Sequence, residues 1–421
     1  MKCYNCGGYV KNEYVFCPNC GSLLGSSEAK IAPPPSSDVL REINSLSSKQ
    51  TFITRLLIVC VLFSFIFLIS GMCFSLLMLR GYSSGGFLGL VLGLLAAGIS
   101  ITVSIILLIL IRQIDIYEKE PWSLVVFSFI WGALGATIFS LFANEINQYI
   151  FSALFGERVG DILTSIISAP VFEEIFKLLI IPVIIIFFRV VFNSPLDGIV
   201  YIFCSSLGFK IVEDLLYGAN FTIQGGAMQG FFFLVLARWI LGFMSHPLMS
   251  VFSGFAVGLA TITPNFFLKI VYIVVGYFLS VLAHFIWNFV ASVGVMYFGN
   301  IACLWFPIQI TVMFIIFIAL YFFALNIEKN LLRQSLQDDI SSGFLSYQIL
   351  DELIDFRLRR IRKSSLGEYN RRLYDVFMTE LASYTLLKRQ SVSAIFSDIH
   401  DEIQRKRQII SYIKPYIYGN L

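Results

Sequence analysis

The chain has 421 residues, of which 57% are hydrophobic and 14% are charged. Soluble domains carry about 25% charged residues, so this composition excludes an ordinary soluble protein and predicts an all-α protein that crosses a membrane several times. The net charge of +3 is small and acidic and basic residues are mixed, so no nucleic-acid partner is expected.

Four cysteines near the N-terminus form two C-x2-C pairs that are ten residues apart, namely Cys3, Cys6, Cys17 and Cys20. Four thiolates at this spacing are typical of a tetrahedral structural Zn²⁺ site. Residues 1–24 are too few to fold on an apolar core, so zinc would supply their folding free energy. The spacing predicts a zinc ribbon, with a disulfide-linked segment as the alternative. No cleavable signal peptide is expected, because the N-terminus is polar and cysteine-rich.

Residues 25–50 contain three consecutive prolines followed by serines, which is typical of a linker. A helix needs about 20 apolar residues to cross a bilayer. A transmembrane domain is therefore predicted over residues 51–327, and Pro247 predicts a kink or tilt within it. It contains eight apolar segments, at about 56–79, 86–111, 122–143, 164–188, 196–217, 230–259, 268–296 and 302–326.

Lys and Arg residues gather at alternate ends of these segments, and the loops between carry only Arg80 and Arg158. Because cytoplasmic loops are enriched in basic residues, we expect a multi-pass protein of the cell membrane with both termini in the cytoplasm. That orientation agrees with reduced cysteines in the predicted zinc ribbon. The cysteine-rich segment resembles zinc-ribbon modules at the ends of many prokaryotic proteins, so a prokaryotic cell is expected.

Residues 328–421 hold 15 of the 30 Lys and Arg residues and 12 of the 27 Asp and Glu residues. Apolar residues recur there at helical spacing, for example Ile349, Leu353 and Ile361. The pattern predicts a cytoplasmic tail of three or four amphipathic helices. This tail and the zinc ribbon are the candidate contacts for a cytoplasmic protein partner.

Glu173 and Glu174 lie inside the apolar segment 166–188, with Lys177 one turn further on. A charge at the centre of a membrane helix costs about 2.5–3.5 kcal/mol or more, so two adjacent carboxylates indicate a buried polar site. Successive residues point about 100° apart around a helix. One glutamate can therefore enter the site while the other pairs with Lys177.

Three further predicted spans carry polar residues at a similar depth. These residues are Glu213, Asp214, Arg238, His246, His284 and Asn288. With the expected orientation they fall with the glutamate pair in the outer half of the bilayer, so we predict that they form one site. Glycines such as Gly254 and Gly258 would let the helices approach closely.

Each of these residues also has a purely structural interpretation. The glutamates could form an ion pair with Lys177, Glu213 and Asp214 could mark the membrane surface, and the histidines could join two helices by hydrogen bonds. The joint pattern favours a site, because two of the three histidines in the chain lie in predicted spans at matching depth.

This set of side chains suits the hydrolysis of an amide bond. A glutamate can act as a general base toward water. Two histidines and a carboxylate can hold a catalytic divalent metal with one position open for water, and Glu213, His246 and His284 are the candidate ligands. The H-E-x-x-H motif is absent, so metal-free activation of water by a glutamate stays open, with the histidines stabilising the oxyanion.

Five stretches resemble the PrsW-type membrane proteases, relatives of the CAAX-processing and bacteriocin-processing proteases, in order and spacing. They are YEKEPW at 117–122, APVFEEIFK at 169–177, LDGIVY at 196–201 with EDLLY at 213–217, Arg238 with His246, and HFIWN at 284–288. The resemblance covers about residues 112–292. It implies that Glu173 and Glu174 are essential and that Glu213, His246 and His284 complete the catalytic site. We expect the neighbouring polar residues to support the site, namely Lys177, Arg238, Asn288 and Asp214.

The resemblance implies an endopeptidase acting within or beside the membrane on a membrane-anchored protein, for example site-1 cleavage of an anti-sigma-factor-like regulator. Asp214 departs from the family pattern, which often has Asn there, so its role stays open. One alternative function is an ion- or proton-coupled transporter, which predicts inverted repeats that the sequence does not show. Another is a scaffold that presents the zinc ribbon, which predicts tolerance of alanine at both 173 and 174.

Overall fold

The computed structural model describes residues 1–3, 5–11, 14, 16–20, 22, 24, 49–391 and 397–418. Apart from residues 49 and 50, the predicted linker lies outside these ranges. The described residues form helices and no named strand, which confirms the predicted all-α fold. The chain divides into two compact units, Ile53–Ala324 and the combination of Met1–Phe52 with Leu325–Leu421.

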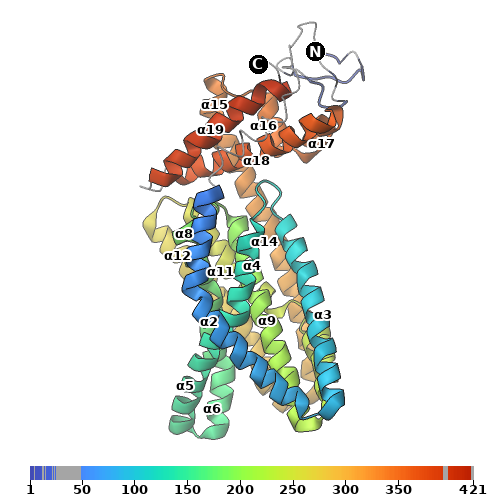
Figure 1. Cartoon of the computed structure of the whole chain (residues 1–421), viewed down its shortest axis with the longest axis vertical. Coiled ribbons are helices and arrows are strands. Elements are labelled where there is room, and N and C mark those ends of the chain that lie inside the picture. Colours follow the sequence, from blue (N-terminus) through green and yellow to red (C-terminus); the bar gives the residue numbers. More distant parts are fainter. Residues whose placement is uncertain are drawn as a thin grey trace. The chain divides into compact units, whose positions relative to one another are not determined.

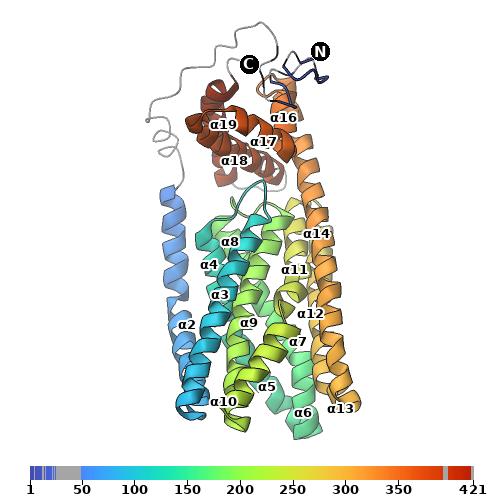
Figure 2. The same cartoon turned by 90° about the vertical axis from the view of Figure 1, so that its right-hand side faces the viewer.

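The unit Ile53–Ala324 is a bundle of long helices (Figures 1 and 2). Its α-helices are α2 Lys49–Ser83, α3 Gly86–Gln113, α4 Trp122–Ile130, α5 Thr137–Phe155, α6 Glu157–Leu163, α7 Ala169–Leu178, α8 Ile180–Phe188, α9 Pro195–Gly225, α10 Ala227–Phe233, α11 Ser245–Ile262, α12 Phe266–Phe289, α13 Val295–Phe298 and α14 Trp305–Ser335. Shorter π-helical and 3-10 segments join several of them, namely η1 Trp131–Ala136, η2 Thr164–Ser168, η3 Leu234–Leu241, η4 Val290–Gly294 and η5 Gly299–Leu304.

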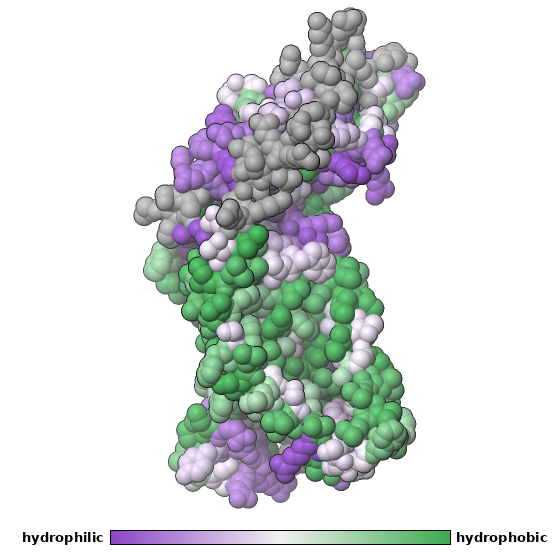
Figure 3. All heavy atoms as spheres, viewed as in Figure 1, coloured by the Kyte–Doolittle hydropathy of each residue, from purple (hydrophilic) through white to green (hydrophobic). Residues whose placement is uncertain are grey.

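Within the described residues, five helical stretches are long and apolar enough to cross a membrane, by length and composition. They are Thr51–Ser83, Gly86–Gln113, Trp122–Phe155, Ser245–Ile262 and Phe266–Ser341. Figure 3 shows that apolar residues cover most of the visible surface of this bundle, while polar residues gather where α5 meets α6. Such a surface suits lipid as the solvent. The number of eight spans stays a prediction, since the predicted segment 164–188 is divided into short helices at Leu179.

Helix α9 is the central element of this bundle, and it contacts α3, α4, α10 and α11. Ser194 and Asp197 form a capping box at its start, and Pro195 occupies the first turn, where a missing N–H costs nothing. All residues from Pro195 to Lys210 are buried. The first half of α9 therefore lies in the core of the bundle and does not face lipid.

Helices α9 and α11 approach closely through small residues. A Cβ atom built on Gly254 would lie 2.3 Å from the backbone oxygen of Gly198, and one on Gly258 would lie 2.6 Å from Cα of Pro195. This geometry matches the close approach expected at these two glycines. Since α9 carries Glu213 and α11 carries His246, the contact also sets the distance between two candidate site residues.

We expect the substitution Gly254→Ala to destabilise the protein by about 1–3 kcal/mol, because the added methyl group overpacks the α9–α11 contact. The measurement is the denaturation midpoint of the purified protein in detergent. Gly71→Ala is the matched control, since nothing lies within 4 Å of a Cβ at that helical position. Equal midpoints for the two variants would contradict the close contact.

The predicted sixth span is interrupted, which confirms a kink near Pro247 and makes it a full break. Segment η3 ends at Leu241, and α11 begins at Ser245. Between them Met244 adopts a left-handed conformation with φ of 56°, which is unusual for a residue with a side chain. Pro247 falls in the first turn of α11, where proline is tolerated. The break places His246 at the start of a helix.

The unit of Met1–Phe52 and Leu325–Leu421 combines the cysteine-rich segment with the tail helices, which the sequence predicts as separate modules. The tail helices are α15 Gln337–Ser341, α16 Tyr347–Ile354, α17 Phe356–Ser365, α18 Glu368–Ser391 and α19 Ser397–Tyr418. The guanidinium of Arg362 lies 3.4 Å from the ring centre of Phe16, and Lys11 forms a 3.0 Å ion pair with Asp351. The two segments therefore pack on one another.

Candidate active site and zinc ribbon

Helix α7 brings three charged residues into the interior of the bundle. Pro170 lies in its first turn, and the helix ends at Leu178. Glu173 is 5% exposed, and Glu174 and Lys177 are fully buried. Buried charges persist only where partners satisfy them, so the contacts of these three residues define the site.

Glu174 is held on both of its carboxylate oxygens. Its Oε1 accepts hydrogen bonds from Nζ of Lys177 at 2.8 Å and from Nδ1 of His284 at 2.9 Å. Its Oε2 accepts a 2.5 Å hydrogen bond from the hydroxyl of Ser250. Three donors from three helices leave this carboxylate no freedom to move. Ser250 was not predicted, although it lies one helical turn after His246.

The carboxylate of Glu173 has fewer polar contacts than that of Glu174. Its Oε2 is buried and has no hydrogen-bond partner among the described residues. Nε2 of His284 lies 3.7 Å from this oxygen and Nζ of Lys177 lies 3.8 Å from it. These gaps are longer than hydrogen bonds. Glu174 therefore pairs closely with Lys177, while Glu173 keeps one carboxylate oxygen without a donor.

The two histidines face one another, with ring centres 4.9 Å apart and planes at 90°. Because the carboxylate of Glu174 only accepts, Nδ1 of His284 carries the hydrogen and its Nε2 keeps a lone pair when the ring is neutral. His246 lies 2.8 Å from Glu213 through Nε2 and 2.8 Å from Lys177 through Nδ1.

A second charged group adjoins the first at Glu213. Arg238 donates to Glu213 and also to Asp214, where the distance from Nε is 2.5 Å. Lys210 forms a 2.5 Å ion pair with Asp214 and donates to the backbone oxygen of Arg238. Lys210 was not predicted, but its spacing of four residues from Asp214 on one helix could have indicated it. Asp214 thus serves to fix Arg238 and Lys210.

Asn288 has a different partner from the other predicted residues. Its side-chain amide donates a 2.9 Å hydrogen bond to the backbone oxygen of Ser165. Although Asn288 lies one turn beyond His284, the contact ties α12 to η2 and does not reach the carboxylates. The structure therefore brings together eight of the nine predicted residues of this site, and places Asn288 at its edge.

The charges of this cluster do not cancel. Glu173, Glu174, Glu213 and Asp214 face Lys177, Lys210 and Arg238, which leaves one negative charge in excess when both histidines are neutral. A bound cation or a proton would remove this excess.

One oxygen of Glu173 and one nitrogen each of His246 and His284 lie within 4.8 Å of one another. Two imidazoles and one carboxylate are a common ligand set for a catalytic zinc ion. The unpartnered Oε2 of Glu173 and the free Nε2 of His284 fit this role. The predicted ligand Glu213 instead contacts His246 and Arg238.

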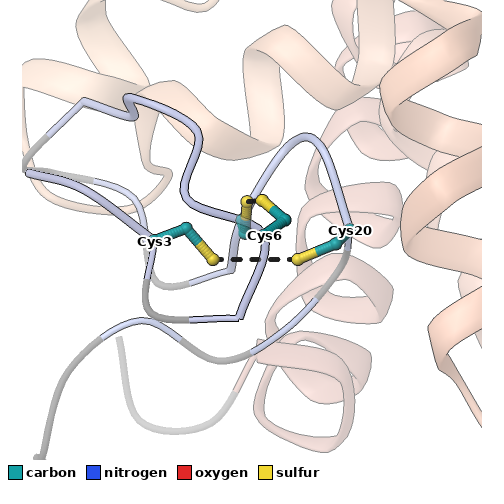
Figure 4. Close-up of side chains that lie close together, drawn as sticks. Cys3, Cys6 and Cys20 are labelled. Atoms are coloured by element: carbon teal, nitrogen blue, oxygen red, sulfur yellow. Dashed lines mark hydrogen bonds between the residues drawn. The ribbon is translucent and has the colours of Figure 1, made fainter.

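The cysteines form a second candidate metal centre. Cys3 and Cys20 point toward one another (Figure 4), with sulfurs 3.7 Å apart, and the sulfurs of Cys6 and Cys17 are 3.5 Å apart. Zn–S bonds of about 2.3 Å in a tetrahedron require sulfur separations of about 3.8 Å, whereas a disulfide requires about 2.05 Å. All eight cysteines are free thiols. The geometry is compatible with the predicted zinc ribbon.

The hydroxyl of Ser22 supports thiolates at this centre. It lies 3.3 Å from the sulfur of Cys3 and 3.0 Å from that of Cys20. Hydrogen bonding to Ser22 is the main cause that lowers the pKa of Cys3 to about 6, and it also lowers the pKa of Cys20. Since the thiolate is the form that binds metal, the surroundings of Cys3 and Cys20 favour zinc binding, whereas burial raises the pKa of Cys17 to about 12.

We expect the purified protein to contain one zinc ion per chain in this centre, because four thiolates complete a tetrahedral site. The variant Cys20→Ser should lose that zinc and become sensitive to proteases within the first 24 residues, since metal binding supplies their folding free energy. Elemental analysis and limited proteolysis check this. Cys60→Ser, at an exposed thiol far along the chain, is the control. Full zinc content in Cys20→Ser would contradict a site built from four thiolates.

Residues 120–321 match the PrsW family of intramembrane metalloproteases. This part of the chain is similar to that family. The description of this family as intramembrane metalloproteases agrees with the recognised family and with the predicted class of enzyme. The matched region includes α7, η3, α9 and the other elements that carry the cluster around Glu173. The predicted zinc ribbon and the whole tail, residues 328–421, lie outside it.

Three bacterial relatives, each named Protease PrsW, support this placement. The protein of Geobacillus kaustophilus is 30% identical over 167 residues, which are 40% of this chain and 66% of the relative. The Bacillus subtilis protein is 31% identical over 148 residues, 35% of this chain and 60% of the relative. The Oceanobacillus iheyensis protein is 27% identical over 200 residues, 47% of this chain and 83% of the relative. The aligned part thus spans less than two thirds of two of them. No solved structure matches the chain.

Bacterial PrsW relatives and helices of membrane-spanning length support the predicted location in a prokaryotic membrane.

Proposed function

We propose that this chain is a membrane endopeptidase that hydrolyses a peptide bond of a membrane-anchored protein with a water molecule activated at Glu173. The observation that carries the proposal is the buried Oε2 of Glu173, which has no hydrogen-bond donor among the described residues and faces Nε2 of His284 across 3.7 Å. A carboxylate that is buried, unsatisfied and beside an imidazole is suited to take a proton from water.

The other residues have positioning and electrostatic roles in this proposal. Glu174 orients His284 through the 2.9 Å bond at Nδ1, in the way that carboxylates commonly orient catalytic histidines. Glu213 orients His246 in the same manner at 2.8 Å. Lys177, with its ammonium group 2.8 Å from both Glu174 and His246, supplies positive charge next to the reacting atoms. Positive charge fixed in a dry site stabilises a developing oxyanion.

A divalent metal fits this donor set, and Glu173, His246 and His284 are the residues that would hold it. Such a metal would supply Lewis acidity and would lower the pKa of a bound water. To become a ligand, Nδ1 of His246 would first have to release the ammonium group of Lys177, which lies 2.8 Å away. Lys177 would then remain with Glu174.

The arrangement of basic residues along the chain supports a site in the outer half of the bilayer, with both termini in the cytoplasm. We propose that the substrate is a single-pass or otherwise membrane-anchored protein, cut near the outer membrane surface. An anti-sigma-factor-like regulator is the substrate class that the family resemblance favours.

The experiment compares the membrane proteomes of cells that express the wild type, Glu173→Gln or Glu145→Gln at equal levels. Glu145 is an exposed acid on α5 and serves as the charge-matched control. We expect a membrane protein that is shortened in cells with the wild type and with Glu145→Gln but full-length with Glu173→Gln. Identical fragment patterns in all three strains would overturn the proposal. The position of the new terminus would show on which side of the membrane the bond is cut.

A further inference from the structure

Three buried carboxyl groups meet at one point where the loop between α3 and α4 contacts the start of α9. Asp115 is 2% exposed, Glu120 is 1% exposed and Asp197 is 2% exposed. One oxygen of each lies within 4.8 Å of one oxygen of the other two. Nothing in the proposed peptide chemistry uses them, since Asp197 lies on α9 about 24 Å from Glu213 at about 1.5 Å per residue.

The hydrogen bonds around two of these groups favour their ionised form. Oδ1 of Asp115 accepts from the backbone N–H groups of Tyr117 at 3.0 Å and Glu118 at 2.9 Å. Asp197 accepts from the backbone N–H groups of Asn193 at 2.6 Å and Ser194 at 2.8 Å, and from the hydroxyl of Ser194. Donors of this kind stabilise carboxylates. The positive end of the α9 dipole adds to the effect at Asp197.

Glu120 supplies the observation that points to a ligand. Its Oε2 accepts a hydrogen bond from the hydroxyl of Tyr201, but its Oε1 is buried and has no hydrogen-bond partner among the described residues. A buried carboxylate oxygen without a partner is costly. The remaining oxygen is therefore available to a group that the chain itself does not provide.

No basic side chain balances the three carboxyl groups. Among the residues that the structure describes, none of the three takes part in an ion pair. Arg112, at the end of α3, donates a 2.6 Å hydrogen bond to the backbone oxygen of Glu120, and its guanidinium lies over the ring of Trp122. Burial, together with the charge of Asp197, raises the pKa of both Asp115 and Glu120 well above the usual range. A cation would relieve this unfavourable charge.

We infer that Asp115, Glu120 and Asp197 bind a hard divalent cation of the Mg²⁺, Ca²⁺ or Mn²⁺ class, which ties the loop between α3 and α4 to the start of α9. Carboxylate oxygens are the ligands that these ions prefer, and no cysteine or histidine belongs to the group. The alternative is a proton shared between Glu120 and Asp197, whose side chains lie close enough to hydrogen bond.

The test uses the full-length protein in detergent, prepared without divalent ions other than the tightly held zinc. Its melting temperature is measured as Ca²⁺, Mg²⁺ or Mn²⁺ is added, and bound Mn²⁺ is counted by electron paramagnetic resonance. We expect at least one ion to raise the melting temperature by about 3–8 °C at saturation. Ca²⁺ and Mg²⁺ prefer oxygen ligands, so a response to them distinguishes this cluster from the thiolates and from the two histidines.

Asp115→Asn and Glu120→Gln should abolish the rise and remove one bound Mn²⁺ per chain. Glu145→Gln, at an exposed acid, and Glu173→Gln, in the other carboxylate cluster, should keep it. If a variant fails to fold, the melting temperature of the wild type in the presence of added divalent ions still tests the inference. A wild type that responds to none of the three ions would overturn the inference, and so would a response that persists in Asp115→Asn. Stabilisation by acid alone, with no effect of divalent ions, would identify the shared proton.

Discussion

Replacing Glu173 by glutamine should reduce peptide-bond hydrolysis by about 10²–10⁴-fold, the usual contribution of general acid–base catalysis, and should change the free energy of unfolding by less than about 1 kcal/mol. Both effects follow from the same observation. The Oε2 of Glu173 has no hydrogen-bond partner among the described residues, so an amide at this position loses the base but breaks few bonds. The measurements are cleavage of a reconstituted substrate and the denaturation midpoint in detergent.

Glu174→Gln is the comparison that makes this result specific. Glu174 accepts three hydrogen bonds from Lys177, His284 and Ser250, and the loss of its charge leaves Lys177 without its closest counter-ion. We expect this variant to lose about 2 kcal/mol or more of stability as well as activity. The opposite pattern, an unstable Glu173→Gln and a stable but inactive Glu174→Gln, would assign the catalytic role to Glu174.

Replacing Lys177 by methionine should destabilise the protein by about 3–5 kcal/mol, the cost of leaving a buried charge without its partner. The ammonium group of Lys177 is fully buried, lies 2.8 Å from Glu174 and 2.8 Å from His246, and sits 4.3 Å from the ring centre of Phe209. Methionine keeps most of the apolar contact and removes the charge. Unfolding in increasing concentrations of denaturant measures the loss.

Lys269→Met is the control for this result, since Lys269 lies at the start of α12 and is partly exposed. It should change the midpoint by less than about 0.5 kcal/mol. If Lys177→Met proved as stable as Lys269→Met, the carboxylates around Lys177 would have to be protonated. The excess negative charge inferred for the cluster would then be absent.

Much of the fold follows from patterns that are local in the sequence. The long apolar segments predict the helices, because a backbone surrounded by lipid must satisfy its own hydrogen bonds. The Ser194-Pro195-Leu196-Asp197 stretch predicts the start of α9, since both capping residues and the first-turn proline are adjacent. Local patterns failed at Leu179, where the structure ends one helix and begins another inside a segment that reads as one apolar span.

The sequence predicts which residues belong to the candidate site better than it predicts which of those residues contact one another. Eight polar residues within predicted spans pointed to the cluster, because each would be too costly in lipid without partners. Helical spacing alone does not decide whether Glu173 or Glu174 is the glutamate whose carboxylate keeps an oxygen without a hydrogen-bond donor. The choice depends on Ser250 and His284, which reach Glu174 from α11 and α12, 76 and 110 residues away in the chain. No local pattern carries that information.

The amino-acid sequence by itself determined that this protein is helical and lies in a membrane. It also determined that four cysteines have zinc-binding spacing and that carboxylates and imidazoles lie in the apolar segments. Each of these properties depends on residue type and on spacing within one segment. Only the tertiary structure decided which oxygen of which glutamate is left without a donor, and that Asp115 and Glu120 meet Asp197. Those facts depend on distances between segments that are far apart in the chain, and packing sets such distances through contacts like the one between Gly198 and Gly254.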